Sequence, residues 1–322
     1  MVFRIPLEVF PGYWGYSHLV VHDGKLFLVD VGSGIGGSTR CLRNGLEWIS
    51  NEHKISATLD QVDYIIITHS HIDHIGGLGQ VMELAPNAVI CVHELTRPFL
   101  VSYDEQLLIS SHRTREFLKR AGVAPERVET LMDLYRLGRR PAPRQKIGIS
   151  LVDGQELENT FSVIHVPGHD PGLIMLKVDN ILLTSDHVLP NTSVALIPEA
   201  IAPFSGVAHY MESLDKALTV AGVTVALGGH ESSMFDYYDV ALRTRKSTSE
   251  KVQRVYDLCA EPSTIYEIAT QIYGLLEGYG ELLKLGQTGA RIEYLNQRGL
   301  VVVDNLDALQ NTSVSAVRYR IA

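Results

Sequence analysis

The stretch THSHIDHIGG, residues 68–77, decides the fold of this chain. It follows an apolar run, which is typical of a buried strand, and it ends in a glycine pair that favours a turn. Three imidazoles and one carboxylate therefore stand where a strand ends. His69 and His71 can point to one side of the extended turn, whereas Asp73 and His74 enter the next helix and point to a neighbouring spot. Two adjacent metal ions would satisfy this arrangement.

The residue types indicate which metal such a site prefers. Imidazole and carboxylate ligands without cysteine suit zinc best, and iron or manganese less well. A polar surface loop is the plainer alternative, but so many ligand-type residues crowded at one strand end make it the weaker interpretation. We therefore expect two Zn²⁺ ions as cofactors, with Fe or Mn as alternatives.

Three further ligand-type residues each follow a β-rich run. They are His169, Asp186 and His230. A lone histidine at a strand end is usually structural, but strand ends on one edge of a sandwich converge in space, so we treat all three as candidates for the same site. No Gly-x-Ser-x-Gly motif follows a strand, so the sequence gives no sign of a nucleophilic serine.

The first cluster resembles the His-x-His-x-Asp-His signature of the metallo-β-lactamase superfamily. The resemblance implies a ligand set shared between two metals and a bridging hydroxide that attacks a carbonyl. In that set one metal takes His69, His71 and His169, the other takes Asp73, His74 and His230, and Asp186 bridges the two.

Two carboxylates place the chain within that superfamily. Asp73 would orient the bridging hydroxide and is the expected catalytic residue. Together with Asp186, it separates the chain from true β-lactamases, whose second metal site uses cysteine. The chain is more similar to glyoxalase-II-type thioesterases, lactonases and lactamase-like endoribonucleases.

The order of predicted elements indicates two β-rich halves. Strands and a helix precede the signature, and strands resume at 147–152 and continue to about residue 227. We expect an α/β fold, an α/β/β/α sandwich that forms a metallo-β-lactamase-fold catalytic domain over residues 1–245. A helical, basic insertion at about 94–146 separates the halves and is either a lid over the site or a solvated helical face.

Residues 246–322 are expected to form a small winged-helix-like domain. A capping box at 264–267 precedes an apolar-periodic helix, a second helix is expected at about 290–298, and a hairpin of 300–303 and 313–321 would be the wing. The second helix lacks the excess of Lys and Arg that DNA recognition needs. A docked structural appendage is therefore favoured over a nucleic-acid reader.

Several residues near the ligands receive supporting roles. Asp30 ends an apolar strand and is expected to steady a metal-ligating histidine. Tyr13, Trp14 and Tyr16 lie in a predicted loop, where they would form either a pocket wall for an apolar acyl group or part of the core. His187 adjoins a ligand position and is a candidate for substrate contact.

Composition limits the partners and the location. The chain has 322 residues, 45% of them hydrophobic, and a formal net charge of -9, which argues against general binding to nucleic acid or anionic membrane. Its three cysteines are widely separated and predict no disulfide framework, as in a reducing cytoplasm. We find no signal peptide and no apolar run long enough to span a membrane, so we expect a cytoplasmic protein.

These observations predict a dinuclear metal-dependent hydrolase of small-molecule esters or thioesters. Arginine side chains of the insertion could bind a negatively charged tail of the substrate. A phosphodiesterase or endoribonuclease, which would need a basic path to the metals, and a lactonase, which would need a small apolar pocket, remain as alternatives. A DNA-binding regulator that uses the winged helix is disfavoured by the intact ligand set. The sequence leaves the oligomeric state open.

Overall fold

A computed structural model describes residues 1–137, 144–311 and 316–322. Arg139 and Arg140 of the basic insertion, and the first part of the strand expected at 313–321, lie outside or partly outside these ranges. Within the described ranges, none of the helices has the length and apolar character needed to cross a membrane.

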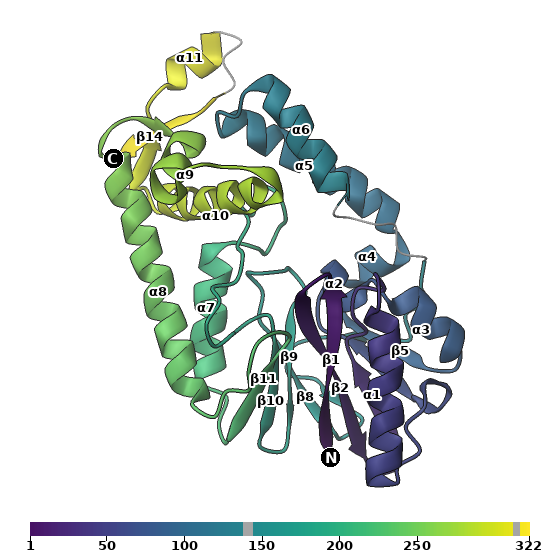
Figure 1. Ribbon diagram of the computed structural model, residues 1–322. Helices are drawn as coiled ribbons and strands as arrows, with labels where there is room; N and C mark the ends of the chain where they lie inside the picture. The colour runs from purple at the N-terminus through teal and green to yellow at the C-terminus, as the bar shows by residue number, and fades with distance from the viewer. Residues whose placement is uncertain (138–143, 312–315) are drawn as a thin grey trace.

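Two β-sheets form the centre of the molecule (Figure 1). The first sheet has the strand order β1-β2-β3-β4-β5-β6, and the second has the order β11-β10-β9-β8-β7. The first comprises β1 (Val2–Phe10), β2 (Tyr13–His22), β3 (Lys25–Val29), β4 (Tyr64–Ile67), β5 (Val89–His93) and β6 (Ile149–Leu151). The second comprises β7 (Glu156–Leu157), β8 (Phe161–His165), β9 (Ile174–Val178), β10 (Ile181–Ser185) and β11 (Val225–Gly228).

The sheets pack face to face through apolar side chains. Phe27 of β3 meets Phe161 of β8 edge-on, with ring centroids 5.2 Å apart. Buried side chains of β4, β9 and β10 complete this layer, because strands covered on both faces carry nearly continuous apolar runs. The inner layer is thus a core shared by both sheets.

Helices cover the outer faces of both sheets. On the first sheet, α1 buries Leu42, Leu46 and Ile49, the spacing of one helical face, beside α3. On the second sheet, α7 and the first half of α8 bury their apolar faces. The helices are α1 (Ser38–His53), α2 (Ile72–Ile75), α3 (Leu78–Leu84), α7 (Val207–Leu218) and α8 (Tyr237–Asp257). The α/β/β/α sandwich is therefore confirmed.

The insertion and the C-terminal segment pack together as one helical unit, defined here as residues 103–137, 258–311 and 316–322 (Figure 1). Leu118 and Leu131 of the insertion share a buried core with Ile268 and Leu285 of the C-terminal segment. Its helices are α5 (Tyr103–Arg120), α6 (Pro125–Leu137), α9 (Ile265–Tyr273), α10 (Gly278–Gln297) and α11 (Leu306–Asn311). The preceding helix α4 (Arg97–Val101) instead buries Leu100 in the core of the first sheet. Segments far apart in sequence thus form one body beside the sandwich.

Helix α8 links the sandwich to the helical unit. Its first half packs on the second sheet through Tyr237 and Val240, and its last turn places Val255 in the core of the helical unit. Figure 1 shows α8 running along one side of the molecule between the two. The expected domain boundary at residue 245 therefore falls inside a continuous helix.

The C-terminal segment differs in detail from the winged-helix expectation. The capping box is present: Thr264 Oγ1 accepts from Glu267 N, and Thr264 N donates to the Glu267 carboxylate. The helix expected at 290–298 actually begins at Gly278, since its apolar face continues toward the insertion. The expected simple hairpin is a three-stranded sheet of order β12-β14-β13 that contains β12 (Ser263–Thr264), β13 (Val301–Val303) and β14 (Arg318–Ile321). Its identity as a winged helix remains a prediction.

Candidate metal centre

The ligand-type residues gather at one edge of the sandwich because of strand direction. In the first sheet β3, β4 and β5 run parallel, and in the second sheet β10 runs parallel to β11. Carboxyl ends of parallel strands meet at one edge, where loops carry functional side chains. His69 follows β4, Asp186 follows β10 and His230 follows β11.

The glycine pair after the first cluster allows a close approach of backbones. A Cβ atom on Gly76 would lie 2.3 Å from Ser33 O, and one on Gly77 would lie 2.6 Å from Val31 O. Both distances are far below van der Waals contact. The short helix α2, which carries Asp73 and His74, can therefore rest directly on the segment after β3.

Seven side chains form two adjacent groups that could each hold a metal ion. Within each group, the potential ligand atoms lie within 4.8 Å of one another. The first group is His69, His71 and His169, and the second is Asp73, His74, Asp186 and His230. This is the division implied by the resemblance, with Asp186 placed in the second group.

Asp186 lies between the other ligand-type atoms. Its Oδ2 atom is 3.5 Å from His74 Nε2, 3.5 Å from His230 Nε2 and 3.9 Å from His169 Nε2. His169 belongs to the first group and the other two to the second. One carboxylate oxygen thus faces both groups, as a bridging ligand must.

Most of the imidazole rings are held through Nδ1, which leaves Nε2 directed at the centre. The Nδ1–H of His169 donates to Ala195 O at 2.7 Å, and that of His230 donates to Trp14 O at 2.8 Å. His69 Nδ1 lies 3.1 Å from the Thr68 hydroxyl. Partners of this kind fix the tautomer and the orientation of a ligating histidine.

Asp30 orients the fourth ring, that of His74. Its carboxylate accepts from His74 Nδ1 at 2.8 Å, and also from Thr68 N and Thr68 Oγ1. Asp30 itself has φ +58°, a conformation that most side chains avoid. The structure therefore places Asp30 where the sequence argument needs it, in direct contact with a ligand-type histidine.

Several buried polar atoms at the centre lack a hydrogen-bond partner among the described residues. They are Nε2 of His69, His74 and His169, and Oδ1 of Asp186. Buried polar atoms without partners are costly, and a site for an ion is a standard reason for them. These atoms face one another across the two groups, so the donor set fits two bound metal ions.

The two groups differ in charge. Burial lowers the pKa of His71 to about 4, and burial lowers the pKa of His69 well below its usual value. Burial would raise the pKa of Asp186, but His74 and His230 hold it well below its usual value. His69 and His71 of the first group therefore offer neutral imidazoles and Asp186 an ionised carboxylate, the forms in which both residue types bind metal.

Comparison with known proteins identifies the fold family. A model of the Metallo-beta-lactamase superfamily matches residues 15–230. The chain belongs to the metallo-β-lactamase superfamily.

Two relatives extend this finding. The metallo-beta-lactamase fold-containing protein ST1585 of Sulfurisphaera tokodaii is 29% identical over 175 residues, which are 53% of this chain and 61% of the relative. The match thus spans less than two thirds of that relative. The probable metallo-hydrolase YqjP of Bacillus subtilis is 21% identical over 289 residues, 86% of each chain.

Solved structures show the same metallo-β-lactamase fold. The family protein TTHA1429 of Thermus thermophilus superposes with a TM-score of 0.75 at 22% identity, covering 100% of this chain and 98% of that one. The protein TTHA1623, solved in a di-iron-bound form, superposes with a TM-score of 0.50 at 19% identity, covering 75% of this chain and 98% of its own. At such low sequence identity these superpositions show a shared fold and do not show a shared function.

A pocket of about 460 Å³ opens onto the metal-site edge of this superfamily member. His71, Asp73 and His169 form its floor. Its walls come from β1, α2, α4, the loop before α7, and the helical unit. The wall residues are Phe10, Ser70, Ile72, Ile75, Phe99, Tyr103, Leu107, Ser110, Ala195, Ile197, Tyr279 and Leu283. The insertion does fold over the metal edge, but with apolar side chains.

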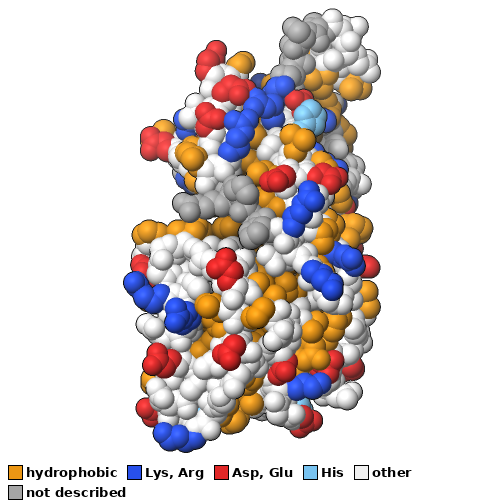
Figure 2. All heavy atoms as spheres, turned by 90° about the vertical axis from the view of Figure 1, so that its right-hand side faces the viewer, with side chains coloured by type: hydrophobic (Ala, Val, Ile, Leu, Met, Phe, Trp, Pro, Cys, Tyr) orange, Lys and Arg blue, Asp and Glu red, His pale blue; other side chains and the backbone are white. Residues whose placement is uncertain are grey.

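The described basic side chains of the insertion do not line this pocket. No Lys or Arg lines this pocket among the described residues. Three insertion arginines pair with acids, namely Arg115 with Glu129, Arg127 with Glu281, and Arg136 with Asp133. Figure 2 shows Lys and Arg side chains interspersed with Asp and Glu over the upper part of one face. The expected arginine contact with an anionic tail therefore gains no support from the described residues.

Tyr13, Trp14 and Tyr16, which were expected in a loop, belong to strand β2. The loop expectation was wrong because Tyr13 to Tyr16 pair with β1. The Tyr13 ring lies 5.0 Å from the His230 ring, the backbone of Trp14 holds His230, and the Tyr16 ring stacks under Arg4. Only Tyr13 therefore contacts a ligand-type side chain through its own ring.

His187 lies away from the pocket. Its side chain is fully buried, and its ring meets Tyr210 at a centroid distance of 5.3 Å. Burial lowers its pKa to about 3, so it stays neutral. The structure gives it a packing position, and its contact with a substrate stays a prediction.

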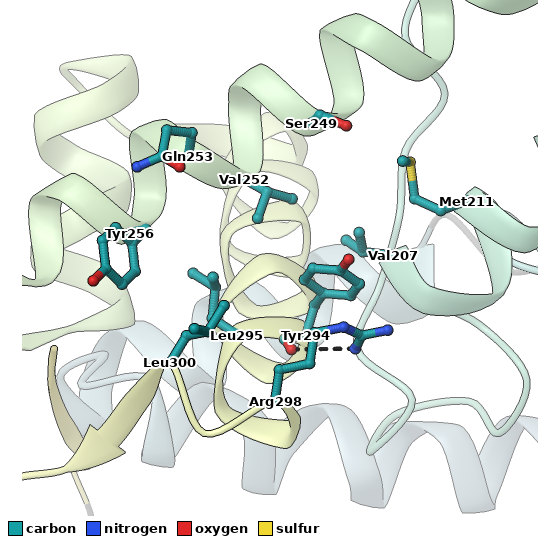
Figure 3. A pocket seen from close by; sticks show the side chains of 10 residues that line it. All are labelled: Val207, Met211, Ser249, Val252, Gln253, Tyr256, Tyr294, Leu295, Arg298 and Leu300. Atoms are coloured by element: carbon teal, nitrogen blue, oxygen red, sulfur yellow. Dashed lines mark hydrogen bonds between the residues drawn. The ribbon is translucent and has the colours of Figure 1, made fainter. Parts of the chain in front are cut away.

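A second pocket, of about 280 Å³, lies between α7, α8 and α10 (Figure 3). The Arg298 guanidinium stacks 3.7 Å over the Tyr294 ring and donates to Tyr294 O. None of the ligand-type residues lines it. The pocket above the metal edge is therefore the one of these two that adjoins the ligand-type residues.

Sequence reasoning missed most of that pocket. Phe99, Tyr103 and Leu107 stand at helical spacing, as do Tyr279 and Leu283, so the apolar stripes themselves were visible. Which surface such a stripe covers depends on how the helices dock. The backbone carbonyls of Ala195 and Trp14, which accept hydrogen bonds from His169 and His230, cannot be predicted from residue types.

Proposed function

We propose that this protein is a dinuclear metal-dependent hydrolase of esters or thioesters with an apolar acyl group. The observation that carries the proposal is the set of buried Nε2 and Oδ1 atoms that lack a partner among the described residues and lie beside an apolar pocket, which His169 of this set also lines. A pocket of about 460 Å³ lies in the range of small-molecule sites.

The ligand set would hold two divalent metal ions. His69, His71 and His169 would hold one, Asp73, His74 and His230 the other, and Asp186 both. Such a pair supplies a water of lowered pKa and polarises the scissile carbonyl. Zinc suits the nitrogen-rich ligands best, and the di-iron form of TTHA1623 keeps iron as the alternative.

Asp73 would act on the attacking water and on the leaving group. Its carboxylate lies at the pocket floor, 3.2 Å from His230 Nε2. Although burial raises its pKa, His74 and His230 lower it below its usual value, so the carboxylate is ionised at neutral pH. It can therefore accept a proton from water and pass it to the departing alcohol or thiol.

The pocket walls would choose the substrate. Apolar side chains exclude water around the acyl group, which strengthens every electrostatic interaction at the floor. The absence of Lys and Arg from the described lining disfavours a phosphodiester, because a phosphate backbone needs a basic path. A lactone remains the second candidate, since the walls are apolar.

A substrate screen tests the proposal. The zinc-loaded and iron-loaded proteins are assayed on p-nitrophenyl esters, acyl thioesters, acyl lactones and bis-p-nitrophenyl phosphate. We expect kcat/KM for an ester or thioester to exceed that for the phosphodiester and to rise with acyl length until the pocket is full. A preference for the phosphodiester, abolished by chelation, would contradict the proposal.

A further inference from the structure

Arg4 connects the first sheet to the turn that carries His230. It lies on β1, yet its Nη2 donates to Gly228 O at 3.0 Å and to His230 O at 3.3 Å. Gly228 ends β11 of the second sheet, and His230 lies in the turn after it. A single guanidinium thus joins the two sheets beside a ligand-type residue.

The guanidinium is held in place for this role. Its Cζ atom lies 3.4 Å from the centre of the Tyr16 ring, a close cation–π contact that fixes its plane. Its Nε is buried and has no hydrogen-bond partner among the described residues. A planar, always charged donor stacked on an aromatic ring is difficult for another side chain to replace.

The rest of the β1–β2 hairpin holds the same turn. Tyr16 N donates to Gly229 O at 2.8 Å, and His230 Nδ1–H donates to Trp14 O at 2.8 Å. The Tyr13 ring packs on the imidazole of His230. Arg4 is the charged member of this set and the one that binds the carbonyl on each side of Gly229.

The turn has little freedom to shift. A Cβ atom on Gly229 would lie 2.4 Å from Asp186 Oδ1 and 2.8 Å from His74 Cε1, so the backbone there rests on two other ligand-type side chains. A small displacement of the turn would therefore move His230 and disturb Asp186 and His74 together.

We propose that Arg4 is a positioning residue for the second metal site. Through the carbonyls of Gly228 and His230, and stacked on Tyr16, it fixes the turn that presents His230 toward Asp73 and Asp186. This inference rests on the proposed metal-dependent function. It concerns the group of Asp73, His74, Asp186 and His230, to which the ligand-type side chains next to the turn belong.

Metal affinity is the direct test. Arg4→Met keeps the length of the side chain and removes the donors, and Arg4→Lys keeps the charge without the planar fork. In competition titrations with a chromogenic chelator, we expect Arg4→Met to weaken one of two zinc equivalents by about 10–100-fold, the usual cost of losing a partner that orients a ligand. Arg4→Lys should lose less. Arg245→Met, which removes an exposed arginine paired with Asp215, is the matched control.

Thermal unfolding separates positioning from simple stabilisation. A residue that only stabilises the hairpin lowers Tm equally in the metal-free and zinc-loaded proteins. A positioning residue lowers the Tm of the zinc-loaded protein more, because weaker metal binding contributes less to stability. Equal shifts in both forms, or two unchanged zinc affinities in Arg4→Met, would overturn the proposal.

Chemical rescue gives a second readout, which compares one variant with and without an added guanidinium ion. Arg4 and Trp14 line an open surface pocket of about 690 Å³, so a small guanidinium ion can reach the space left in Arg4→Ala. We expect millimolar guanidinium to restore the second zinc equivalent, and sodium at equal ionic strength to leave it unrestored. Equal effects of both ions would contradict the proposal. A wild-type protein that binds no metal would instead overturn the proposed function.

Discussion

The metal edge and the helical unit beside it differ in how far apart in sequence their residues lie. At the metal edge, four of the ligand-type residues come from one short stretch, and each of the other three directly follows a strand or its turn. In the helical unit, the core joins residues of α5 and α6 to residues of α9 and α10, with more than half of the sandwich between them in sequence. The first region is a local motif, whereas the second exists only after long-range docking.

This difference separates two functions that the chain combines. The metal edge would determine what reaction occurs, since its residue types are those of a hydrolytic metal centre. The helical unit would help to determine which molecule reacts, since its helices α5 and α10 supply apolar walls of the pocket. Substitutions in the two regions should therefore have effects that differ in kind.

The largest effect is expected at the carboxylate that faces both groups. Asp186→Ala removes the bridging ligand, so metal content should fall from two equivalents to one or fewer. Loss of several kcal/mol of transition-state stabilisation corresponds to about a thousandfold lower kcat. Metal analysis and steady-state kinetics measure both, with Asp215→Ala, an exposed carboxylate of α7, as the control. Full activity with a single metal would refute the two-metal arrangement.

Acid should weaken metal binding strongly. In the metal-free protein burial lowers the pKa of His230, but hydrogen bonds to Asp186 and Asp73 raise it to about 10. Burial likewise lowers the pKa of His74, and the surrounding carboxylates raise it well above its usual value. Both rings therefore carry protons at neutral pH that a metal must displace, so affinity should rise with pH, by up to about a hundredfold per unit for two protons.

Zinc-competition titrations at pH 6, 7 and 8 measure this dependence. Calorimetry in buffers of different ionisation enthalpy should show proton release on metal uptake at pH 7. An affinity independent of pH over this range would mean that His74 and His230 are neutral before the metal binds.

A smaller effect is expected when the partner of a ligand-type histidine is changed. Asp30→Asn retains the shape of the side chain, and asparagine tolerates the positive φ at this position. It loses the charge that orients His74, so metal affinity or activity should fall by about 10–100-fold. Metal titration and kinetics check this. An effect equal to that of Asp186→Ala would show that Asp30 does more than orient a ring.

In the helical unit, substitution should change KM and spare kcat. Leu283→Trp fills part of the pocket wall supplied by α10 and should raise KM for a bulky acyl substrate by about tenfold, with little change in kcat. Leu275→Trp, at an exposed position of the same segment, is the matched control. If Leu283→Trp leaves KM unchanged for every acyl length, the helical unit does not contact the substrate.

The smallest effect is expected at the capping box. Thr264→Ala removes the hydroxyl that accepts from Glu267 N at 3.1 Å, which should lower the free energy of unfolding by about 1 kcal/mol. Urea denaturation measures this change. Metal content should stay at the wild-type level, and a loss of metal would show that the two regions are coupled more tightly than their separate cores suggest.

The sequence alone determined the metal edge. A cluster of imidazoles and a carboxylate at a strand end, together with His169, Asp186 and His230 after later strands, predicted a shared site, because carboxyl ends of neighbouring strands converge on one edge. Asp30 could be predicted for the same reason. The sandwich followed from the spacing of apolar runs, which strand and helix geometry fixes locally.

Only the tertiary structure decided how the chain surrounds that edge. The aromatic residues Tyr13 to Tyr16 formed a strand whose backbone holds His230, and the helix expected to begin near residue 290 began at Gly278 and reached the pocket. Arg115 and Arg127 of the insertion paired with acids, while apolar residues of α5 lined the pocket above the metal edge. An amphipathic pattern specifies that a face will be buried, but the partner that buries it is selected by packing among distant segments, which no local pattern encodes.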